Sequence, residues 1–138
     1  MLRSADLAAW LAGQLATLDP AESAPVKTGP LSGLTEEPDR IVTVVREGGR
    51  APDDEGILYT VAFRLEVRGA QRDHDDAEVL ADEVDDALLD AACPLLMGQW
   101  KVLAIAGVAR PTLVGIDTAE RSTLWSSYEV QVPATGIL

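Results

Sequence analysis

The chain has 138 residues, 47% of them hydrophobic, which suffices for one domain with its own core and argues against disorder along its whole length. Its formal net charge of −12 leaves it without the basic face that a nucleic-acid-binding surface needs. Cys93 is the only cysteine, which excludes a disulfide within the chain, and no apolar run approaches the ~20 residues of a membrane span.

The first predicted element is an amphipathic helix over residues 3–18. Four leucines recur there at helical spacing, namely Leu7, Leu11, Leu15 and Leu18. Ser4 is the expected N-cap, and Pro20 disfavours a helical conformation in the residue before it. The segment lacks the continuous apolar stretch and the cleavage site of a signal peptide, so we expect a protein that is made and kept in a cytoplasm.

Residues 19–39 follow as a connection with four prolines and two glycines. Long irregular connections are uncommon in small domains and often serve as functional arms, although a solvated linker has the same composition. We treat the segment as a Pro/Gly-rich loop within one domain that spans residues 1–138.

The next stretch predicts two strands. Residues 40–45, RIVTVV, are rich in β-branched side chains, and residues 57–68, ILYTVAFRLEVR, alternate with a period of two. The apolar face of the second strand would contain Ile57, Tyr59, Val61, Phe63, Leu65 and Val67. Residues 46–56, REGGRAPDDEG, read as a charged loop with a turn at Gly48 and Gly49, so an antiparallel hairpin is the expected arrangement.

The second half predicts a helix from about Asp73 to Ala92, ended by Pro94, and two strands over residues 101–109 and 123–132. The connection 110–122 has room for further strand. The element order α-β-β-α-β-β indicates an α+β fold, in which a mixed, mainly antiparallel sheet of about four to five strands packs against two helices.

The only histidine, His74, lies among Asp73, Asp75 and Asp76. A metal site needs ligands that converge, and Glu78 is the one carboxylate three or four residues from His74. A helix start explains the cluster better, because an N-cap carboxylate accepts backbone N–H bonds and the first helical turn favours negative charge. A small metal-dependent enzyme centred on His74 stays as an alternative.

An acidic stripe runs along the second helix, opposite its apolar face, and consists of Glu78, Asp82, Asp86 and Asp90. Like charges at i,i+4 each cost roughly 0.2–0.5 kcal/mol, and no Lys or Arg lies between Asp73 and Gly98 to relieve them. The stripe is either a solubilising face or a surface that repels DNA or meets a basic partner. Val79 and Leu89 flank it as apolar residues outside the packed face.

Signatures of enzymes are lacking elsewhere in the sequence. There is no Gly-rich phosphate loop, Cys93 has no basic cluster to activate it, and Ser126 and Ser127 have no histidine at a recognisable spacing. A buried structural role is the expectation for Cys93. We assign no catalytic, cofactor-binding or metal-binding residue.

Three stretches of the chain carry a family resemblance: VVREGGRAPD, then YTVAFRLEVRGAQRDHDDAEVLADEVDDALLD, and finally STLWSSYEVQV. The passage from strand to helix through Arg68 and Gly69, the helix over 77–88 and the closing residues 128–132 are its closest features. In this pattern and element order, most of the chain resembles the tail terminator (minor tail or minor capsid) proteins of long-tailed bacteriophages.

This resemblance implies a virion structural protein without enzymatic activity or cofactor. Such proteins are α/β wedges that form a ring of six subunits on the finished tail tube, stop its polymerisation and join it to the head-side connector. DNA passes through the lumen without specific binding. The expected partners are further copies of the chain, the tail tube protein and the connector or stopper protein. The expected location is the head–tail junction of a virion assembled in the host cytoplasm.

Three sets of residues are candidates for the surfaces of such a ring. The charged face of strand 57–68 would contact a neighbouring subunit, provided the domain's own helices leave it uncovered, through Arg64, Glu66 and Arg68. The loops 27–39 and 46–56 would dock the tube or connector, the second through Arg46, Gly48, Gly49 and Arg50. The acidic stripe would face the lumen, where it would not bind DNA phosphates. Another connector or stopper subunit, and a general acidic interaction module, stay as alternatives.

Overall fold

A computed structural model describes residues 1–21, 23–34, 38–50 and 58–133. These residues form two α-helices, a 3-10 helix and seven strands. In chain order the elements are α1 (Ser4–Leu18), β1 (Val26–Thr28), η1 (Leu31–Gly33), β2 (Ile41–Arg50), β3 (Leu58–Gln71), α2 (His74–Leu89), β4 (Leu95–Met97), β5 (Trp100–Val102), β6 (Ala104–Ile116) and β7 (Arg121–Pro133).

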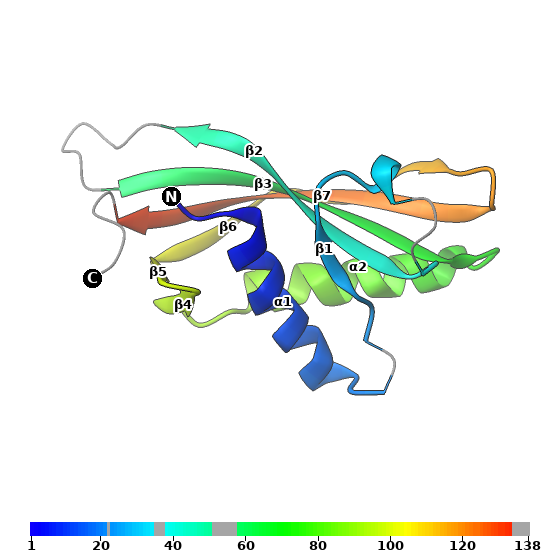
Figure 1. Ribbon diagram of the computed structural model, residues 1–138, viewed down its shortest axis with the longest axis horizontal. Coiled ribbons are helices and arrows are strands. Elements are labelled where there is room, and N and C mark those ends of the chain that lie inside the picture. Colours follow the sequence, from blue (N-terminus) through cyan, green and yellow to red (C-terminus); the bar gives the residue numbers. More distant parts are fainter. Residues whose placement is uncertain (22, 35–37, 51–57, 134–138) are drawn as a thin grey trace.

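Five strands form one twisted sheet in the order β1-β2-β3-β7-β6 (Figure 1). All neighbours are antiparallel except β1 and β2, which are parallel. A separate antiparallel pair, β4 and β5, lies between the end of α2 and the start of β6. The predicted α+β fold with a mixed, mainly antiparallel sheet and two helices is therefore confirmed, as is the hairpin of β2 and β3.

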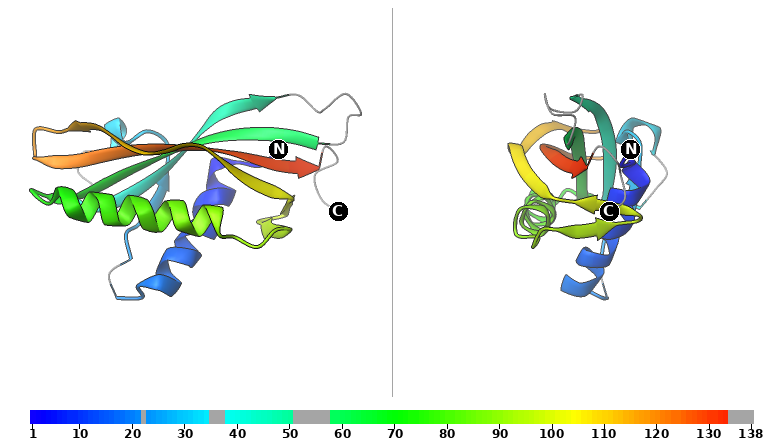
Figure 2. Two further views of the ribbon diagram at one scale, coloured as in Figure 1. Left: turned by 180° about the vertical axis from the view of Figure 1, so that it is seen from behind. Right: turned by 90° about the vertical axis from the view of Figure 1, so that its left-hand side faces the viewer.

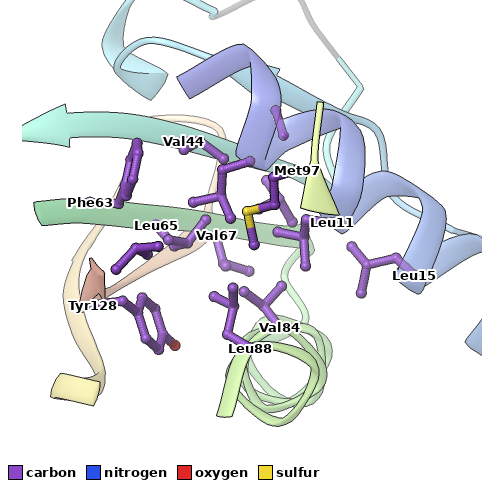
Figure 3. Packing of buried hydrophobic residues seen from close by; sticks show 14 of the residues in the cluster. Leu11, Leu15, Val44, Phe63, Leu65, Val67, Val84, Leu88, Met97 and Tyr128 are labelled. Carbon is purple, nitrogen blue, oxygen red and sulfur yellow. The ribbon is translucent and has the colours of Figure 1, made fainter. Parts of the chain in front are cut away.

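The core lies between one face of the sheet and the two helices, which both cover that face (Figures 1 and 2). Because strand side chains alternate between faces, the odd-numbered residues of β3 and the even-numbered residues of β7 point toward the helices. Figure 3 shows the packing of Phe63, Leu65 and Val67 with Leu11 of α1 and Leu88 of α2. The predicted apolar alternation of residues 61–67 is confirmed.

Helix α1 is where predicted, but its N-cap is not Ser4. The backbone N–H of Arg3, the residue before the helix, donates to the Asp6 carboxylate at 3.0 Å. The hydroxyl of Ser4 instead accepts the backbone N–H of Arg46 at 3.1 Å and so ties the helix to β2. Of the four predicted leucines, Leu18 is exposed at the last position of the helix and the other three are buried.

Strand β2 is longer than predicted, because it continues through residues 46–50 instead of ending in a loop. A register shift between Arg46 and Gly48 allows this, and Gly48 has a positive φ of 104°, which L side chains rarely adopt. The predicted turn at Gly48 and Gly49 is therefore wrong. Residues 51–56 of the predicted loop, and Ile57 at the start of the predicted second strand, lie outside the described residues.

Two further segments differ from the prediction. The Pro/Gly-rich connection contains β1 and η1, and is thus partly regular. The predicted strand 101–109 is interrupted at Leu103, after which β6 runs on through Ile116, so the connection 110–122 does carry strand. Helix α2 ends at Leu89, three residues before the predicted Ala92.

Candidate assembly surfaces

The cluster around His74 is occupied by structural contacts. The Asp73 carboxylate accepts the backbone N–H of Asp76 at 3.0 Å, which confirms the predicted N-cap. Asp76 binds the Arg40 guanidinium at 2.9 Å, and His74 contacts Glu78 at 2.6 Å and the Ser122 hydroxyl at 3.0 Å. Among the described residues, no group of three His, Cys, Asp or Glu side chains is arranged to hold a metal ion.

The acidic stripe is exposed along its whole length. Helix α2 buries Ala77, Leu80, Ala81, Val84 and Leu88 against the sheet and turns the stripe away from it, with Glu78, Asp82, Asp86 and Asp90 all exposed. Val79 and Leu89 are exposed beside it, as predicted. The geometry presents a ridge of negative charge to whatever lies next to α2.

Asp85 is a buried charge that sequence reasoning missed. It lies on the packed face of α2, is 2% exposed, and accepts a hydrogen bond from the Tyr128 hydroxyl at 2.5 Å. Arg110 of β6 approaches its second oxygen at 3.5 Å. Burial, followed by the hydrogen bond to Asp85, raises the pKa of Tyr128 well above its ordinary value. The sequence feature that could have revealed the buried Asp85 was Tyr128, because a tyrosine in the core needs a partner for its hydroxyl.

The predicted subunit-interface trio, Arg64, Glu66 and Arg68, lies on the face of the sheet that the helices leave open. That open face is nevertheless covered at one end by η1 and by residues 38–39. Glu66 and Arg68 are each 3% exposed there. Glu66 accepts the backbone N–H of Leu31 at 3.0 Å, and Arg68 donates to the carbonyl oxygens of Leu34, Pro38 and Asp39. The two α-helices thus leave the trio uncovered, as the prediction requires, but the chain's own connection covers Glu66 and Arg68, which hold it in place.

Arg64 is the member of the trio that still reaches the surface. Its guanidinium stacks over the Trp125 ring at 4.2 Å from the centroid and binds the carboxylates of Glu47 and Glu66 at 2.8 Å each. Together with Val114 and Ile116 of β6, Trp125 lines an open groove of about 460 Å³ along η1. The groove combines an apolar rim with charged groups that already have partners.

Arg121 and Asp117 form a second ion pair at the end of this groove. The Arg121 guanidinium donates to Asp117 at 2.8 Å, and its backbone N–H donates to the other oxygen of the same carboxylate at 2.9 Å. Burial raises the pKa of Asp117, but the bonds from Arg121 and from the backbone of Ala119 outweigh it, so that the net pKa lies below the ordinary 3.8. The pair closes the turn between β6 and β7.

The predicted docking residues Arg46, Gly48, Gly49 and Arg50 lie on the last part of β2, not on a loop. β1 pairs with Val42, Thr43 and Val44, and no other strand among the described residues lies on the outer side of β2. Gly49 packs tightly on β3, since a Cβ there would lie 2.1 Å from the carbonyl oxygen of Thr60, whereas a Cβ on Gly48 would meet nothing within 4 Å. This part of β2 is a short open edge of the sheet.

β6 forms the other edge of the sheet, and most of it is exposed. Four of its apolar side chains project into solvent: Val108, Leu113, Val114 and Ile116. Its sequence, AIAGVARPTLVGI, contains Arg110 as its only charged residue and no acidic one, in a chain whose net charge is −12. An exposed sheet edge with apolar side chains is a surface on which another chain can pair.

Cys93 is half-buried and packs against the core, which is less burial than expected for it. Within the described residues, none of the helices is both long enough and apolar enough to cross a membrane.

Comparison with known proteins gives a likeness in fold. No family model matches the sequence, and no curated protein matches it. Among solved structures, the fold is similar to that of a chain from the virion of a native gene transfer agent particle, with a TM-score of 0.59 and 18% identity. The likeness covers 94% of this chain and 95% of that one, so the two share their architecture from end to end.

Proposed function

We propose that this protein is a structural component of a virion and forms the ring that closes a phage tail tube. The observation that carries the proposal is the end-to-end fold likeness to a virion chain, which extends over 94% of this protein. The resemblance of residues 68–88 and 128–132 to tail terminator proteins points to the same class independently of the fold. The ring has six subunits, caps the tube, and joins it to the head-side connector.

The surfaces of the molecule suit this role. A closed ring needs two different faces on each subunit that complement one another, and the sheet ends in two unlike edges. The ridge formed by Glu78, Asp82, Asp86 and Asp90 supplies a wall of negative charge for the lumen. Such a wall repels the phosphates of passing DNA and keeps them from binding.

Assembly in solution tests the proposal. Light scattering at low and high salt gives the mass of the purified protein, and negative-stain imaging gives the shape of the largest species. Because subunits of charge −12 repel one another, we expect association to increase with salt. The second arm adds purified tail tubes and asks whether the protein binds at one end and stops their growth.

Six-fold rings with a central hole, or a six-fold cap on tube ends, are the expected result. A protein that stays monomeric at every salt concentration and leaves tube growth unchanged would contradict the proposal. A protein that ignores tubes but binds isolated connectors would instead identify it as a neighbouring connector or stopper subunit, which the same fold likeness also accommodates.

A further inference from the structure

The two edges of the main sheet differ in length and in charge. One edge is β6, and the other is the part of β2 beyond its pairing with β1, residues 45–50. Within that part, the backbone N–H of Arg46 is already bonded to Ser4. The stretch 47–50 follows, and in the part of the chain that the structure describes no strand pairs with its outer side. Figure 1 shows the two edges on opposite sides of the β3–β7 pair.

The composition of β6 favours contact with another copy of the same chain. Two copies that carry −12 each repel wherever both present their acidic surfaces. Residues 104–116 contain no acidic side chain, so this edge approaches an acidic neighbour at the lowest electrostatic cost. Arg110 adds a cation to the edge, and it is 82% exposed.

Pro111 limits how much of β6 can pair. Proline has no backbone N–H and breaks a ladder of hydrogen bonds. The pairing of β6 with β7 is also irregular between Gly107 and Ala109, so residues 104–107 form the regular part of the edge. They match the open residues 47–50 of β2 in length. Val108 follows directly after this part and projects into solvent.

The open part of β2 complements this stretch. Glu47 at its surface is partly exposed, and its carboxylate binds Arg64 of the same chain at 2.8 Å. Gly48 has free space where a Cβ would be, and glycine in a strand permits close approach by a neighbouring backbone.

We propose that residues 104–107 of β6 in one subunit pair with residues 47–50 of β2 in the next, so that the sheet continues from subunit to subunit. The contact is heterologous, since it joins two different edges, and it repeats around a ring. This inference rests on the proposed ring and names the surface that forms it.

The first test compares two lysine substitutions at equally exposed apolar positions. Val108 and Leu18 are each 61% exposed, but Val108 lies on the β6 edge and Leu18 ends α1 on the other side of the core. Lysine on an edge strand opposes pairing. Val108→Lys is expected to abolish the multimeric mass that the unchanged protein shows at high salt, while Leu18→Lys retains it. Thermal melting of both variants verifies that each is folded.

The second test detects the contact directly, without requiring a closed ring. In a Cys93→Ser background, protein with Val108→Cys is mixed with protein carrying Glu47→Cys at high concentration and treated with a short bismaleimide. The expected product is a covalent dimer of the two different variants, with little product from either variant alone.

The outcomes separate the inference from the proposed function. Rings that persist in Val108→Lys, together with no cross-link between the two variants, would overturn the inference and leave the ring intact. Cross-linking of Val108→Cys to itself would replace the heterologous contact with a two-fold one and would also overturn it. If neither the unchanged protein nor any variant assembles or cross-links, even on tail tubes, both the inference and the proposed function are contradicted.

Discussion

Asp85 differs from the other acidic residues of α2 because its carboxylate is buried in the core and bonded to Tyr128. Removal of the phenol hydroxyl leaves a buried carboxylate with only Arg110 nearby, at 3.5 Å. Tyr128→Phe should therefore lower the free energy of unfolding by about 1–3 kcal/mol. Chemical denaturation at neutral pH measures the change, with Tyr59→Phe as the control that removes a phenol hydroxyl outside this pair. An equal loss in both variants would contradict the assignment.

The raised pKa of Tyr128 predicts that the stability of the fold decreases at alkaline pH. Because the pKa of Tyr128 is raised in the folded state, the folded protein holds the phenol proton more tightly than the unfolded chain does. The contribution is fully present below the ordinary tyrosine pKa of 10.0 and is lost as the pH rises above it. The Tyr128→Phe variant lacks this contribution.

The lowered pKa of Asp117 predicts that the stability of the fold decreases at acid pH. Its pKa is lowered in the folded state, so its contribution is present above the ordinary 3.8 and is lost as the pH falls below that value. Asp117→Asn keeps an oxygen for the backbone N–H groups but loses the ion pair with Arg121, which should cost about 0.5–1 kcal/mol at pH 7. Denaturation curves measured from pH 7 downward should converge for the two proteins below pH 3.8. A constant difference at every pH would contradict the role of the charge.

At the scale of elements, the joint between β3 and α2 depends on Gly69. A Cβ at this position would lie 2.6 Å from the backbone nitrogen of Ala77, so only glycine lets the first turn of α2 return this closely over the strand. Gly69→Ala should destabilise the fold by about 1–3 kcal/mol, because the helix must move to make room. Gly13→Ala, in the middle of α1 with nothing within 4 Å, is the matched control and should stabilise by about 0.5–1 kcal/mol. Thermal melting measures the change in stability of each variant. Equal shifts in melting temperature for the two variants would contradict the packing argument.

At the scale of the whole molecule, the net charge is −12, and four of the acidic side chains form one exposed face of α2. Asp82→Lys combined with Asp86→Lys converts two of the three repulsive i,i+4 contacts, those of residue 82 with Glu78 and of residue 86 with Asp90, into attractive ones. Residues 82 and 86 remain a like-charge pair, and the variant should stabilise the monomer by about 0.5–1 kcal/mol. If the face lines the lumen of a ring, assembled rings of this variant should retain DNA at low salt and release it at high salt.

Filter binding of rings to labelled DNA, measured against salt concentration, tests this prediction. The control variant changes the net charge by the same four units through lysines at four exposed positions outside the acidic face, Thr28→Lys, Leu96→Lys, Gln99→Lys and Thr118→Lys. Equal retention of DNA by both variants would show that net charge, and not the place of the acidic face, governs the effect.

Local patterns predicted the parts of the fold that depend on periodicity. The alternation of residues 57–68 gave β3 and its buried face, and the acidic start at Asp73 gave the beginning of α2. The prediction was wrong where long-range pairing outweighs local composition. Gly48 and Gly49 read as a turn, yet the ladder with β3 holds them in a strand through a register shift. Glu66 and Arg68 read as surface charges because their partners, Leu31 and the carbonyl oxygens of the connection, are distant in sequence.

The central strand pair of the sheet has a consequence for how the chain reaches its folded state. β3 and β7 are neighbours in space but are separated in sequence by α2 and by β4 to β6. Contacts between distant segments form late, because the intervening chain must first be brought together. During synthesis, the apolar row of Val61, Phe63 and Leu65 therefore emerges long before its partner strand exists. A ribosome-bound chain that ends after α2 has β3 paired with β2 on one edge only. The edge of β3 that β7 later covers stays open, which makes such a chain a substrate for chaperones and prone to aggregation.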